Sequence, residues 1–488
     1  MTYLDKKTIR LSEDVHLFER DGFAAFFHSL RMTKIYGDGK TLATLFRYLK
    51  TPRRRADAVK RFSKPLIEKL MSEGMAVEGM AAREASLKRI KKLVGKFDIT
   101  NIVLLVSNNC NFRCSYCQIE ENMAPEHMVN MSREVAGKAL DLFRRNSRPG
   151  AKKTITITGG EPLLNMDVVR FIIDKVRREL KNTRIVIFTN GSLVTKELAV
   201  YFKDNDILML ISLDGPREMH DSARKMKAGG GSFGPAMNGY KLLKEAGCTI
   251  GISAVGGTHN VKEIRKTFKF FTDLAPSSIG FNFSHFLLNK DNPTEIPIVD
   301  FGRILVEFYG ILRERRIFLE NVSRPIGAFA SNKPKVNECQ AQGHGFTVDA
   351  RGKIGPCKSL VVSDIFSEDM ARVPRIDKNP MFMDWATRSP FMVSKCADCT
   401  ALSICGGGCA YDSYISNKGD FKGIDERVCE YKRYILDYLI WDLFGKIKSK
   451  VIKNKFYSPS VKEQESAFNG YYDRRNELQR SVGHENDK

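Results

Sequence analysis

Three cysteines lie close together in the stretch Cys110-Asn-Phe-Arg-Cys114-Ser-Tyr-Cys117. This C-x3-C-x2-C spacing lets one short loop supply three thiolates to a four-iron cluster, whose fourth iron then has no protein ligand. An iron with an open position can bind a substrate or a cofactor, whereas the fully ligated cluster of an electron-transfer protein cannot. Zinc sites more often use C-x2-C pairs and four ligands, so a zinc site and buried thiols are the weaker alternatives.

A second motif follows the cysteine loop. The loop itself comes after an apolar run, Ile102–Val106, which is typical of a buried strand. Further along, the stretch Thr156-Ile-Thr-Gly159-Gly160-Glu161-Pro162 ends a second predicted strand. Because Gly and Pro are common turn residues, an ordinary turn would explain this stretch if it stood alone.

In this order, the two motifs resemble those of radical S-adenosylmethionine (SAM) enzymes. In that family the open iron binds the amino and carboxylate groups of SAM, and the Gly-Gly-Glu-Pro turn holds the methionine amino group. The resemblance implies that Cys110, Cys114 and Cys117 are the ligands of the SAM-binding cluster.

The resemblance also implies a set of SAM contacts, which are Tyr116, Gly159, Gly160, Glu161, Asn190, Ser212 and Arg224. Tyr116 corresponds to an aromatic residue near the adenine, and the Gly-Gly-Glu turn lines the methionine end. Ser212 and Arg224 match a Ser and an Arg that contact the ribose and carboxylate region in related peptide maturases, since a guanidinium can pair with a carboxylate through two parallel hydrogen bonds. Asn190 lines the same cleft or belongs to a turn. The sequence assigns no catalytic acid or base.

Seven further cysteines gather in the C-terminal part of the chain, which has 11 in all. Their pattern resembles the SPASM extension of many radical SAM enzymes, which holds two auxiliary four-iron clusters. The resemblance implies an inner cluster on Cys339, Cys357 and Cys409, and an outer cluster on Cys396, Cys399, Cys405 and Cys429. Disulfides are disfavoured because the chain shows no secretory signal, whereas zinc stays open for the C-x2-C-x5-C-x3-C part. Cys248 stands apart and is expected to be a buried structural thiol.

Two positions depart from relatives of this kind. Some relatives place an eighth cysteine six residues after the first, where this chain has Gly345. The inner cluster would then keep an open iron unless the adjacent His344 binds it, and a loop role for His344 is the simpler interpretation. The second departure is Lys358, directly after Cys357, where anaerobic sulfatase-maturing relatives have an Asp that acts as a base.

The composition is that of a globular, strongly basic chain. Its 488 residues suffice for about three domains, and its hydrophobic content is 42%. No apolar run approaches the roughly 20 residues that span a membrane, and the first residues lack the core of a signal peptide, so a cytoplasmic protein without a membrane partner is expected. The net charge is +22, and residues 1–100 hold 22 Lys and Arg against 12 Asp and Glu. Such charge favours an acidic peptide or nucleic acid, or is simply a solvated surface.

Residues 1–97 show the order of elements of a small winged-helix domain. A strand pair with Asp21-Gly22 at its turn precedes helical patterns at 41–49, 54–61 and 64–72, and residues 75–77 form a short closing strand. Domains with this order bind leader peptides in enzymes that modify ribosomally made peptides. A winged helix can also bind DNA through a recognition helix in the major groove.

Residues 98–325 alternate strands and helices, which predicts a parallel sheet with right-handed crossovers. The predicted strands are 102–106, 153–157, 184–189, 207–212, 249–255 and 278–283, and helical patterns lie at 132–146, 166–182, 235–246 and 260–273. Six such units suit a partial (β/α)6 radical SAM barrel, with the catalytic groups at the carboxyl ends of the strands. Residues 326–440 are then the SPASM domain, and residues 441–488 a basic and polar C-terminal helix and tail.

The sequence therefore predicts an α/β radical SAM peptide maturase that uses SAM and three [4Fe-4S] clusters. Its expected partners are a precursor peptide, bound through a leader segment, and an electron donor such as flavodoxin or ferredoxin. A cross-link within the peptide is the expected product. One rival is an anaerobic sulfatase-maturing enzyme, which oxidises Cys or Ser to formylglycine and which Lys358 disfavours. The other is a cluster-bearing DNA-binding regulator, which would have no use for a SAM cleft, so nucleic acid is not an expected partner.

Overall fold

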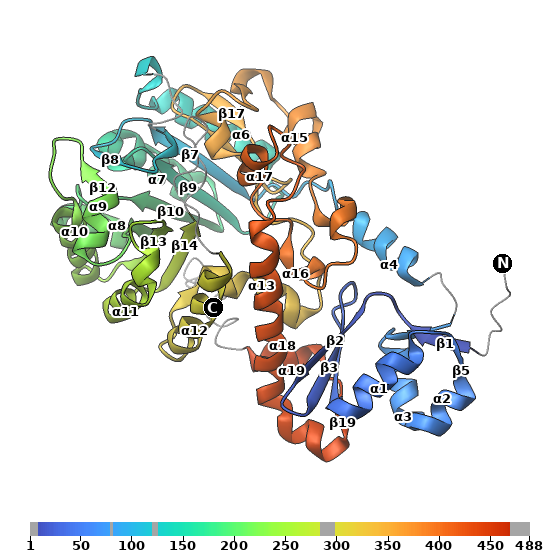
Figure 1. The fold of residues 1–488 in the computed structure, drawn as a ribbon. Helices are drawn as coiled ribbons and strands as arrows, with labels where there is room; N and C mark the ends of the chain where they lie inside the picture. Colours follow the sequence, from blue (N-terminus) through green and yellow to red (C-terminus); the bar gives the residue numbers. More distant parts are fainter. Residues whose placement is uncertain (1–7, 79–81, 120–124, 284–297, 469–488) are drawn as a thin grey trace, which may run out of the picture.

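A central, mostly parallel sheet organises the molecule (Figure 1). The structure is a computed structural model that describes residues 8–78, 82–119, 125–283 and 298–468. Ten strands form the sheet, in the order β15-β14-β13-β11-β10-β9-β7-β16-β17-β18. Helices pack around it, and a smaller N-terminal unit lies on the far side of one long C-terminal helix (Figure 1).

Six strands of this sheet are parallel and follow chain order from β7 to β14. Their bounds are Asn101–Ser107 (β7), Lys153–Gly159 (β9), Thr183–Thr189 (β10), Ile207–Ser212 (β11), Thr249–Gly256 (β13) and Ser278–Phe283 (β14), and Phe318–Leu319 (β15) adds a parallel edge. The connecting helices are Arg133–Asn146 (α6), Met166–Glu179 (α7), Lys196–Asp204 (α8), Arg217–Ala223 (α9), Phe233–Glu245 (α10), Ile264–Leu274 (α11) and Ile298–Glu314 (α12). The strands and helices predicted for this region are present, and the α/β fold class is confirmed.

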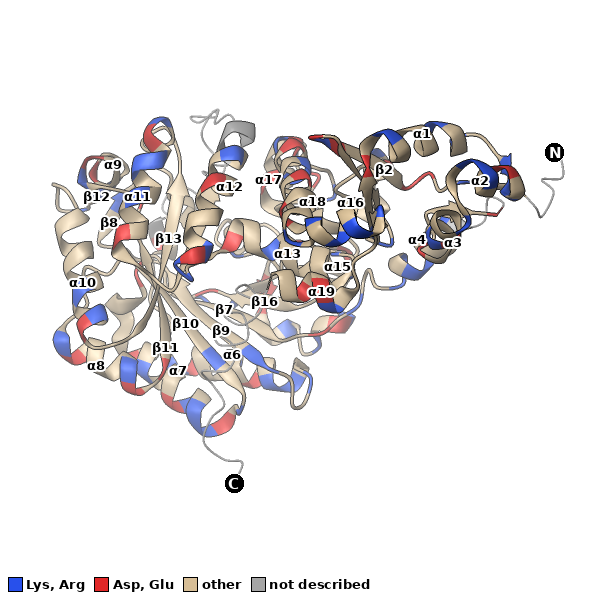
Figure 2. Cartoon of the chain, turned by 90° about the horizontal axis from the view of Figure 1, so that it is seen from below, with Lys and Arg blue, Asp and Glu red and all other residues tan. Residues whose placement is uncertain are grey.

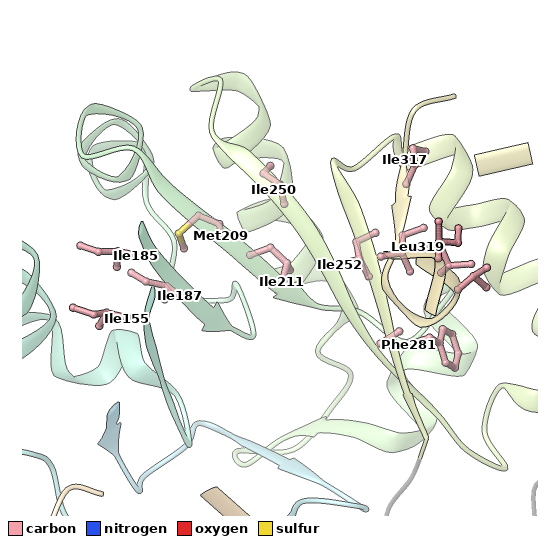
Figure 3. Close-up of a cluster of buried hydrophobic side chains, with 14 of the residues drawn as sticks. Ile155, Ile185, Ile187, Met209, Ile211, Ile250, Ile252, Phe281, Ile317 and Leu319 are labelled. Atoms are coloured by element: carbon pink, nitrogen blue, oxygen red, sulfur yellow. The ribbon is translucent and has the colours of Figure 1, made fainter. Parts of the chain in front are cut away.

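Buried aliphatic side chains hold the helices against the sheet (Figure 3). Ile155, Ile187, Ile211 and Ile252 lie on four neighbouring strands, and each is at most 1% exposed. Full burial of a side chain of this size contributes roughly 1.5–3 kcal/mol. This apolar layer makes the strands a rigid base for the loops at their carboxyl ends.

Local sequence sets where several barrel helices begin. The Ser132 hydroxyl accepts a hydrogen bond from the Val135 amide at the start of α6, and Thr195 does the same for the Leu198 amide in α8. Both are N-caps, which satisfy amides that a first turn leaves unpaired. The chain therefore turns from strand to helix at defined residues.

The cysteine-rich part of the chain extends the barrel sheet. β16 (Gly345–Val348) pairs parallel to β7, and β17 (Lys353–Gly355) and β18 (Glu368–Asp369) follow it antiparallel. Short helices complete this part: Glu320–Ser331 (α13), Lys358–Val361 (α14), Pro380–Ala386 (α15), Leu402–Cys405 (α16) and Ala410–Ser416 (α17). The region after residue 326 is thus continuous with the barrel sheet, a link that the sequence did not predict.

One long helix, α18 (Arg427–Asn454), runs between the two parts of the molecule (Figure 1). The domain boundary expected between residues 440 and 441 falls inside it, where Leu439, Ile440 and Trp441 are all buried. The helix continues there without a break, and its buried side chains extend from Tyr431 to Val451. Among the described residues, no helix is long and apolar enough to cross a membrane.

The N-terminal unit contains the predicted strand pair and helices. Its strands are Thr8–Leu11 (β1), Val15–Arg20 (β2), Phe23–His28 (β3), Lys34–Asp38 (β4), Arg53–Arg54 (β5) and Ala76–Val77 (β6), and its helices are Gly39–Leu49 (α1), Arg55–Phe62 (α2), Lys64–Ser72 (α3) and Ala82–Lys91 (α4). A strand from the other end of the chain, β19 (Phe456–Tyr457), pairs with β4. The sheet order β19-β4-β3-β2 therefore joins both ends of the described chain.

A buried lysine fixes this unit to the rest of the molecule. The Lys34 ammonium donates hydrogen bonds to the Phe329 carbonyl (2.5 Å), the Asn332 side chain (2.8 Å) and the Gln464 side chain (2.5 Å). Gln464 belongs to α19 (Val461–Ala467), beyond β19. A buried ammonium needs such partners because its desolvation is otherwise unfavourable. The N-terminal unit is consequently anchored to both α13 and α19.

Candidate functional site

A cavity of about 310 Å³ lies at the carboxyl ends of the parallel strands. It brings together nine of the predicted site residues, which are Cys110, Cys114, Tyr116, Cys117, Gly159, Gly160, Asn190, Ser212 and Arg224. The carboxyl ends of parallel strands are where such folds place ligands, because the loops from several strands meet there. Glu161 is the one predicted SAM contact that is not part of the described lining.

The cysteine loop is held by a short ladder of its own. Residues Phe112–Cys114 (β8) pair antiparallel with Arg224–Met226 (β12), so that Cys114 and Arg224 are cross-strand partners. The Phe112 amide donates a hydrogen bond to the Cys110 sulfur at 3.3 Å. Burial raises the pKa of both Cys110 and Cys114 to about 12. These thiols therefore keep their protons at neutral pH until a metal displaces them.

The Gly-Gly turn presses directly against the cysteine loop. Gly159 has a φ of +143°, and a Cβ there would lie 2.1 Å from the Ser107 carbonyl oxygen. A Cβ on Gly160 would lie 2.2 Å from the Asn109 carbonyl oxygen. The Gly160 amide donates to the Ser107 carbonyl at 2.7 Å. Only glycine allows the backbones to approach this closely, so the turn fixes the start of the loop.

Glu161 is fully buried and binds the ends of two strands together. Its carboxylate accepts hydrogen bonds from the Leu163 amide (3.0 Å), the Thr189 hydroxyl (2.7 Å) and the Asn190 amide (2.8 Å). Burial raises the pKa of Glu161 to about 7, against the opposing effect of these donors. In this structure Glu161 positions the turn and the end of β10, and its contact with the methionine amino group stays a prediction.

Arg224 already has a carboxylate partner within the chain. Its Nε and Nη2 donate to the two carboxylate oxygens of Asp214 at 2.9 and 3.1 Å. Arg224 thus makes a parallel two-bond pairing within the chain, and its contact with SAM stays a prediction. Ser212, at the end of β11, and Asn190, after β10, also line the cavity.

Sequence reasoning missed three residues in or beside this cavity. Asp214 accepts hydrogen bonds from both Tyr116 and Arg224, and His259 lies 3.2 Å from the same carboxylate. Gln118, next to the last cysteine of the loop, accepts a 2.6 Å hydrogen bond from the Ser359 hydroxyl. Asp214 follows the predicted SAM contact Ser212 by two residues, but nothing in the sequence placed His259 nearby.

The remaining predicted metal ligands form two groups in space. Cys409 interacts electrostatically with Cys357 and Cys339. Cys396 does so with Cys399, Cys405 and Cys429. The members of each predicted auxiliary set therefore lie near one another, and their roles as cluster ligands stay predictions.

No disulfide joins the described cysteines. Within the described ranges, no three His, Cys, Asp or Glu side chains converge on the position of a single metal ion. The thiolates of a four-iron cluster are ligands to different irons rather than to one shared ion. The three groups of cysteines supply thiolates, which are the ligands that four-iron clusters use. By this chemistry each group fits such a cluster.

The gap at Gly345 has a structural cause. Gly345 begins β16, and a Cβ there would lie 2.6 Å from the Asn101 carbonyl oxygen of β7. A cysteine at this position would therefore push the paired strands apart. His344 lines a second cavity together with Cys339, and its Nε2 lies 3.2 Å from the Asn337 amide nitrogen. Its carbonyl accepts from the Thr100 and Asn101 amides, which agrees with a loop role.

Comparison with known families decides what this cavity belongs to. Residues 104–271 match the model of the radical SAM superfamily. The chain contains a radical SAM domain. This domain spans the strands from β7 to β13 and includes all three cysteines of the loop. A radical SAM domain implies bound SAM and a [4Fe-4S] cluster, and Cys110, Cys114 and Cys117 are the thiols within it that face the cavity.

Similar proteins extend beyond the radical SAM domain. The radical SAM cyclopropyl synthase TigE of Paramaledivibacter caminithermalis is 23% identical over 486 residues, which cover 90% of this chain and 97% of that protein. A cysteine-type anaerobic sulfatase-maturating enzyme of Clostridium novyi is 25% identical over 345 residues, which cover 64% and 87%. The protein is thus a radical SAM enzyme related to both groups.

Solved structures share the fold. The structure of anSMEcpe with bound AdoMet matches with a TM-score of 0.59 and 18% identity, covering 77% of this chain and 99% of that chain. Streptococcus suis SuiB bound to S-adenosylmethionine matches with a TM-score of 0.52 and 15% identity, covering 86% and 99%. At these identities the matches support the architecture of the radical SAM domain and its flanking parts alone.

Proposed function

We propose that this enzyme is a maturase that modifies residues of a ribosomally synthesised precursor peptide, with a cross-link as the product. The observation that carries the proposal is the position of the residues after Cys357. Lys358 and Ser359 line the same cavity as the cysteine loop. A peptide residue held there would lie between the SAM-binding cysteines and the inner auxiliary set. When bound, SAM and its cluster supply a 5′-deoxyadenosyl radical that removes hydrogen from the peptide.

The residues of the chain give this cavity its shape and exclude water. The Gly159–Gly160 turn and the 2.6 Å hydrogen bond between Ser359 and Gln118 hold the two sides of the cavity together. Ser212 and Asn190 offer a hydroxyl and an amide to polar groups of SAM. Fixed geometry of this kind accounts for much of the rate enhancement in reactions between bound groups.

The proposed cofactors are SAM and three [4Fe-4S] clusters. One cluster would be bound by Cys110, Cys114 and Cys117. The inner and outer auxiliary clusters would be bound by the two groups of C-terminal cysteines that the fold brings together. An external electron donor such as flavodoxin or ferredoxin would reduce the first cluster.

Relatives support a peptide substrate. TigE is named as a radical SAM cyclopropyl synthase, and its match covers both chains almost fully. SuiB has been solved bound to the precursor peptide SuiA, and that structure matches this one with a TM-score of 0.52 over 86% of the chain. A protein of this length and architecture is therefore consistent with a precursor peptide as its substrate.

Sulfatase maturation is the second candidate, because relatives of that kind are also similar. That reaction needs a base, which such relatives provide as an Asp directly after the second cysteine of the SPASM pattern. Here Lys358 takes the position, and the described lining of the cavity contains no Asp or Glu side chain. The charges of the cavity therefore favour a reaction that does not rely on a carboxylate base.

The N-terminal unit is the proposed site for the leader segment of the precursor. Its Arg53, Arg54 and Arg55 are all exposed, as are Lys88 and Arg89 of α4. Figure 2 shows basic residues along α2 and α4. Such a surface attracts an acidic leader, and leader docking would raise the effective concentration of the modified residues at the cavity.

The proposal is tested by anaerobic turnover of the reconstituted enzyme with SAM, a reductant and any short peptide whose gene adjoins that of the enzyme. We expect 5′-deoxyadenosine to form together with a peptide product whose mass has decreased by two hydrogens. A sulfatase-derived peptide that contains the target Cys or Ser serves as the control. Formylglycine on that control, with no change in the precursor, would reject the maturase and support the second candidate.

A charge-reversal variant tests the role of the N-terminal unit. Replacing Arg53, Arg54 and Arg55 with Glu should raise the KM for the full precursor about tenfold or more at low salt, equivalent to about 1.4 kcal/mol. The effect should shrink at high salt because exposed charges are screened. A matched variant with Lys196, Lys203 and Lys241 replaced by Glu carries the same change in net charge on the barrel. Equal effects of the two variants would show that only overall charge matters.

A further inference from the structure

A buried carboxylate lies behind the cysteine loop and takes no part in the roles assigned so far. Asp214 is 0% exposed and contacts four side-chain or backbone groups. Arg224 donates to it twice, the Tyr116 hydroxyl donates to Oδ2, and the Val255 amide donates to Oδ1 at 2.9 Å. His259 Nε2 lies 3.2 Å from the same Oδ2. We call Tyr116, Asp214, Arg224 and His259 the Asp214 network.

The Asp214 network is attached to the cysteine loop at two points. Tyr116 lies between the second and third cysteines of the loop, and its ring stacks on His259 with centroids 5.6 Å apart. Arg224 is the cross-strand partner of Cys114 in the β8–β12 ladder. The network therefore fixes the loop through both a side chain and a strand pair.

The Asp214–Arg224 pair is ionised. Burial alone would raise the pKa of Asp214, but the Arg224 guanidinium and His259 hold it well below its usual range. Arg224 is also the cross-strand partner of Cys114, and both residues line the same cavity, so the guanidinium lies beside this thiol. Cys114 thus lies next to a guanidinium that is itself paired with the Asp214 carboxylate.

We propose that Asp214 and Arg224 are a positioning pair for the SAM-binding cluster, which balances the charge beside Cys114 and thereby sets the reduction potential of that cluster. One-electron reduction of a [4Fe-4S] cluster from the 2+ to the 1+ state adds one negative charge near its thiolates. A nearby cation or hydrogen-bond donor favours the reduced state, and a nearby carboxylate disfavours it. Within the pair, the effect of the Arg224 guanidinium on the reduction potential opposes the effect of the Asp214 carboxylate. This role also explains why the Arg224 guanidinium faces Asp214.

This inference depends on the radical SAM domain and does not require a peptide substrate. The two members of the pair should have opposite effects when each is removed. In Arg224→Met the carboxylate remains, so the midpoint potential should shift to a more negative value. In Asp214→Asn the guanidinium remains, so the midpoint potential should shift to a more positive value. A residue needed only for packing would give no such reversal of sign.

The test is a redox titration of the reconstituted full-length enzyme, monitored by electron paramagnetic resonance. The signal that changes on addition of SAM identifies the cluster of interest among the three proposed. Asp221→Asn is the matched control, because Asp221 lies on the neighbouring α9 and accepts the Phe233 amide at 2.7 Å outside the network. We expect iron content at the wild-type level in all variants and an unchanged potential in the control. Shifts of the same sign in both variants, or no shift in either, would overturn the proposal.

A second comparison decides the matter if Asp214→Asn fails to hold iron. Arg224→Lys keeps the positive charge but loses the fork, whereas Arg224→Met loses both. We expect the midpoint potential of Arg224→Lys to stay nearer the wild-type value than that of Arg224→Met. Equal potentials in these two variants would show that the charge of Arg224 does not act on the cluster.

Discussion

Replacing Cys110, Cys114 and Cys117 together with Ala should abolish SAM cleavage and remove about four of about 12 iron atoms, since each [4Fe-4S] cluster holds four. All three thiols face the same cavity, and no other described cysteine lines it. Burial raises the pKa of Cys110 and Cys114 to about 12, because water stabilises their thiolate forms poorly. These thiolates therefore depend on a bound metal for a charged partner. Iron analysis and the yield of 5′-deoxyadenosine measure the two effects.

Cys248→Ala is the matched control for this loss. Cys248 lies between α10 and β13, and its thiol donates to the Ala199 carbonyl at 3.3 Å, away from the cavity. This variant should keep both its iron and its SAM cleavage. If the triple variant retained the wild-type iron content, the assignment of the loop as a cluster site would be wrong.

Replacing Gly160 with Ala should reduce SAM cleavage by about 100-fold or more, because small displacements of reacting groups have effects of that size. The added methyl group would meet the Asn109 carbonyl oxygen at 2.2 Å and the Asn109 carbonyl carbon at 2.5 Å. Asn109 directly precedes Cys110, so the clash is relieved only if the cysteine loop moves. The rate of 5′-deoxyadenosine formation at saturating SAM measures the change.

Gly310→Ala separates this steric effect from a general loss of glycine. Gly310 lies inside α12, and a Cβ there meets nothing within 4 Å. This substitution should leave cleavage unchanged and favour the helix, since Ala is the better helix former. Comparable losses in the two variants would mean that the close approach at Gly160 does not control the loop.

The fold of the barrel could be predicted because its pattern is local. Short continuous apolar runs such as Ile102–Val106, which alternate with amphipathic helical patterns, indicate buried parallel strands by their length and by this alternation. The same holds for the N-terminal strand pair, where Asp21-Gly22 marks the turn. The boundary expected between residues 440 and 441 lies inside α18, which runs without a break from Arg427 to Asn454 and has no local signal at that position.

The sequence by itself determined the chemistry of this protein: the cysteine spacings and the Gly-Gly-Glu-Pro turn depend on residues close together in the chain, and their order is enough to indicate a radical SAM domain. Only the tertiary structure decided how these parts meet. It paired β16 with β7 so closely that no cysteine side chain fits at Gly345. It also paired β19 with β4. It also placed the Arg224 guanidinium against the Asp214 carboxylate, to which it donates a hydrogen bond. Such contacts join residues far apart in the chain, and their geometry depends on the packing of the whole sheet rather than on any local pattern.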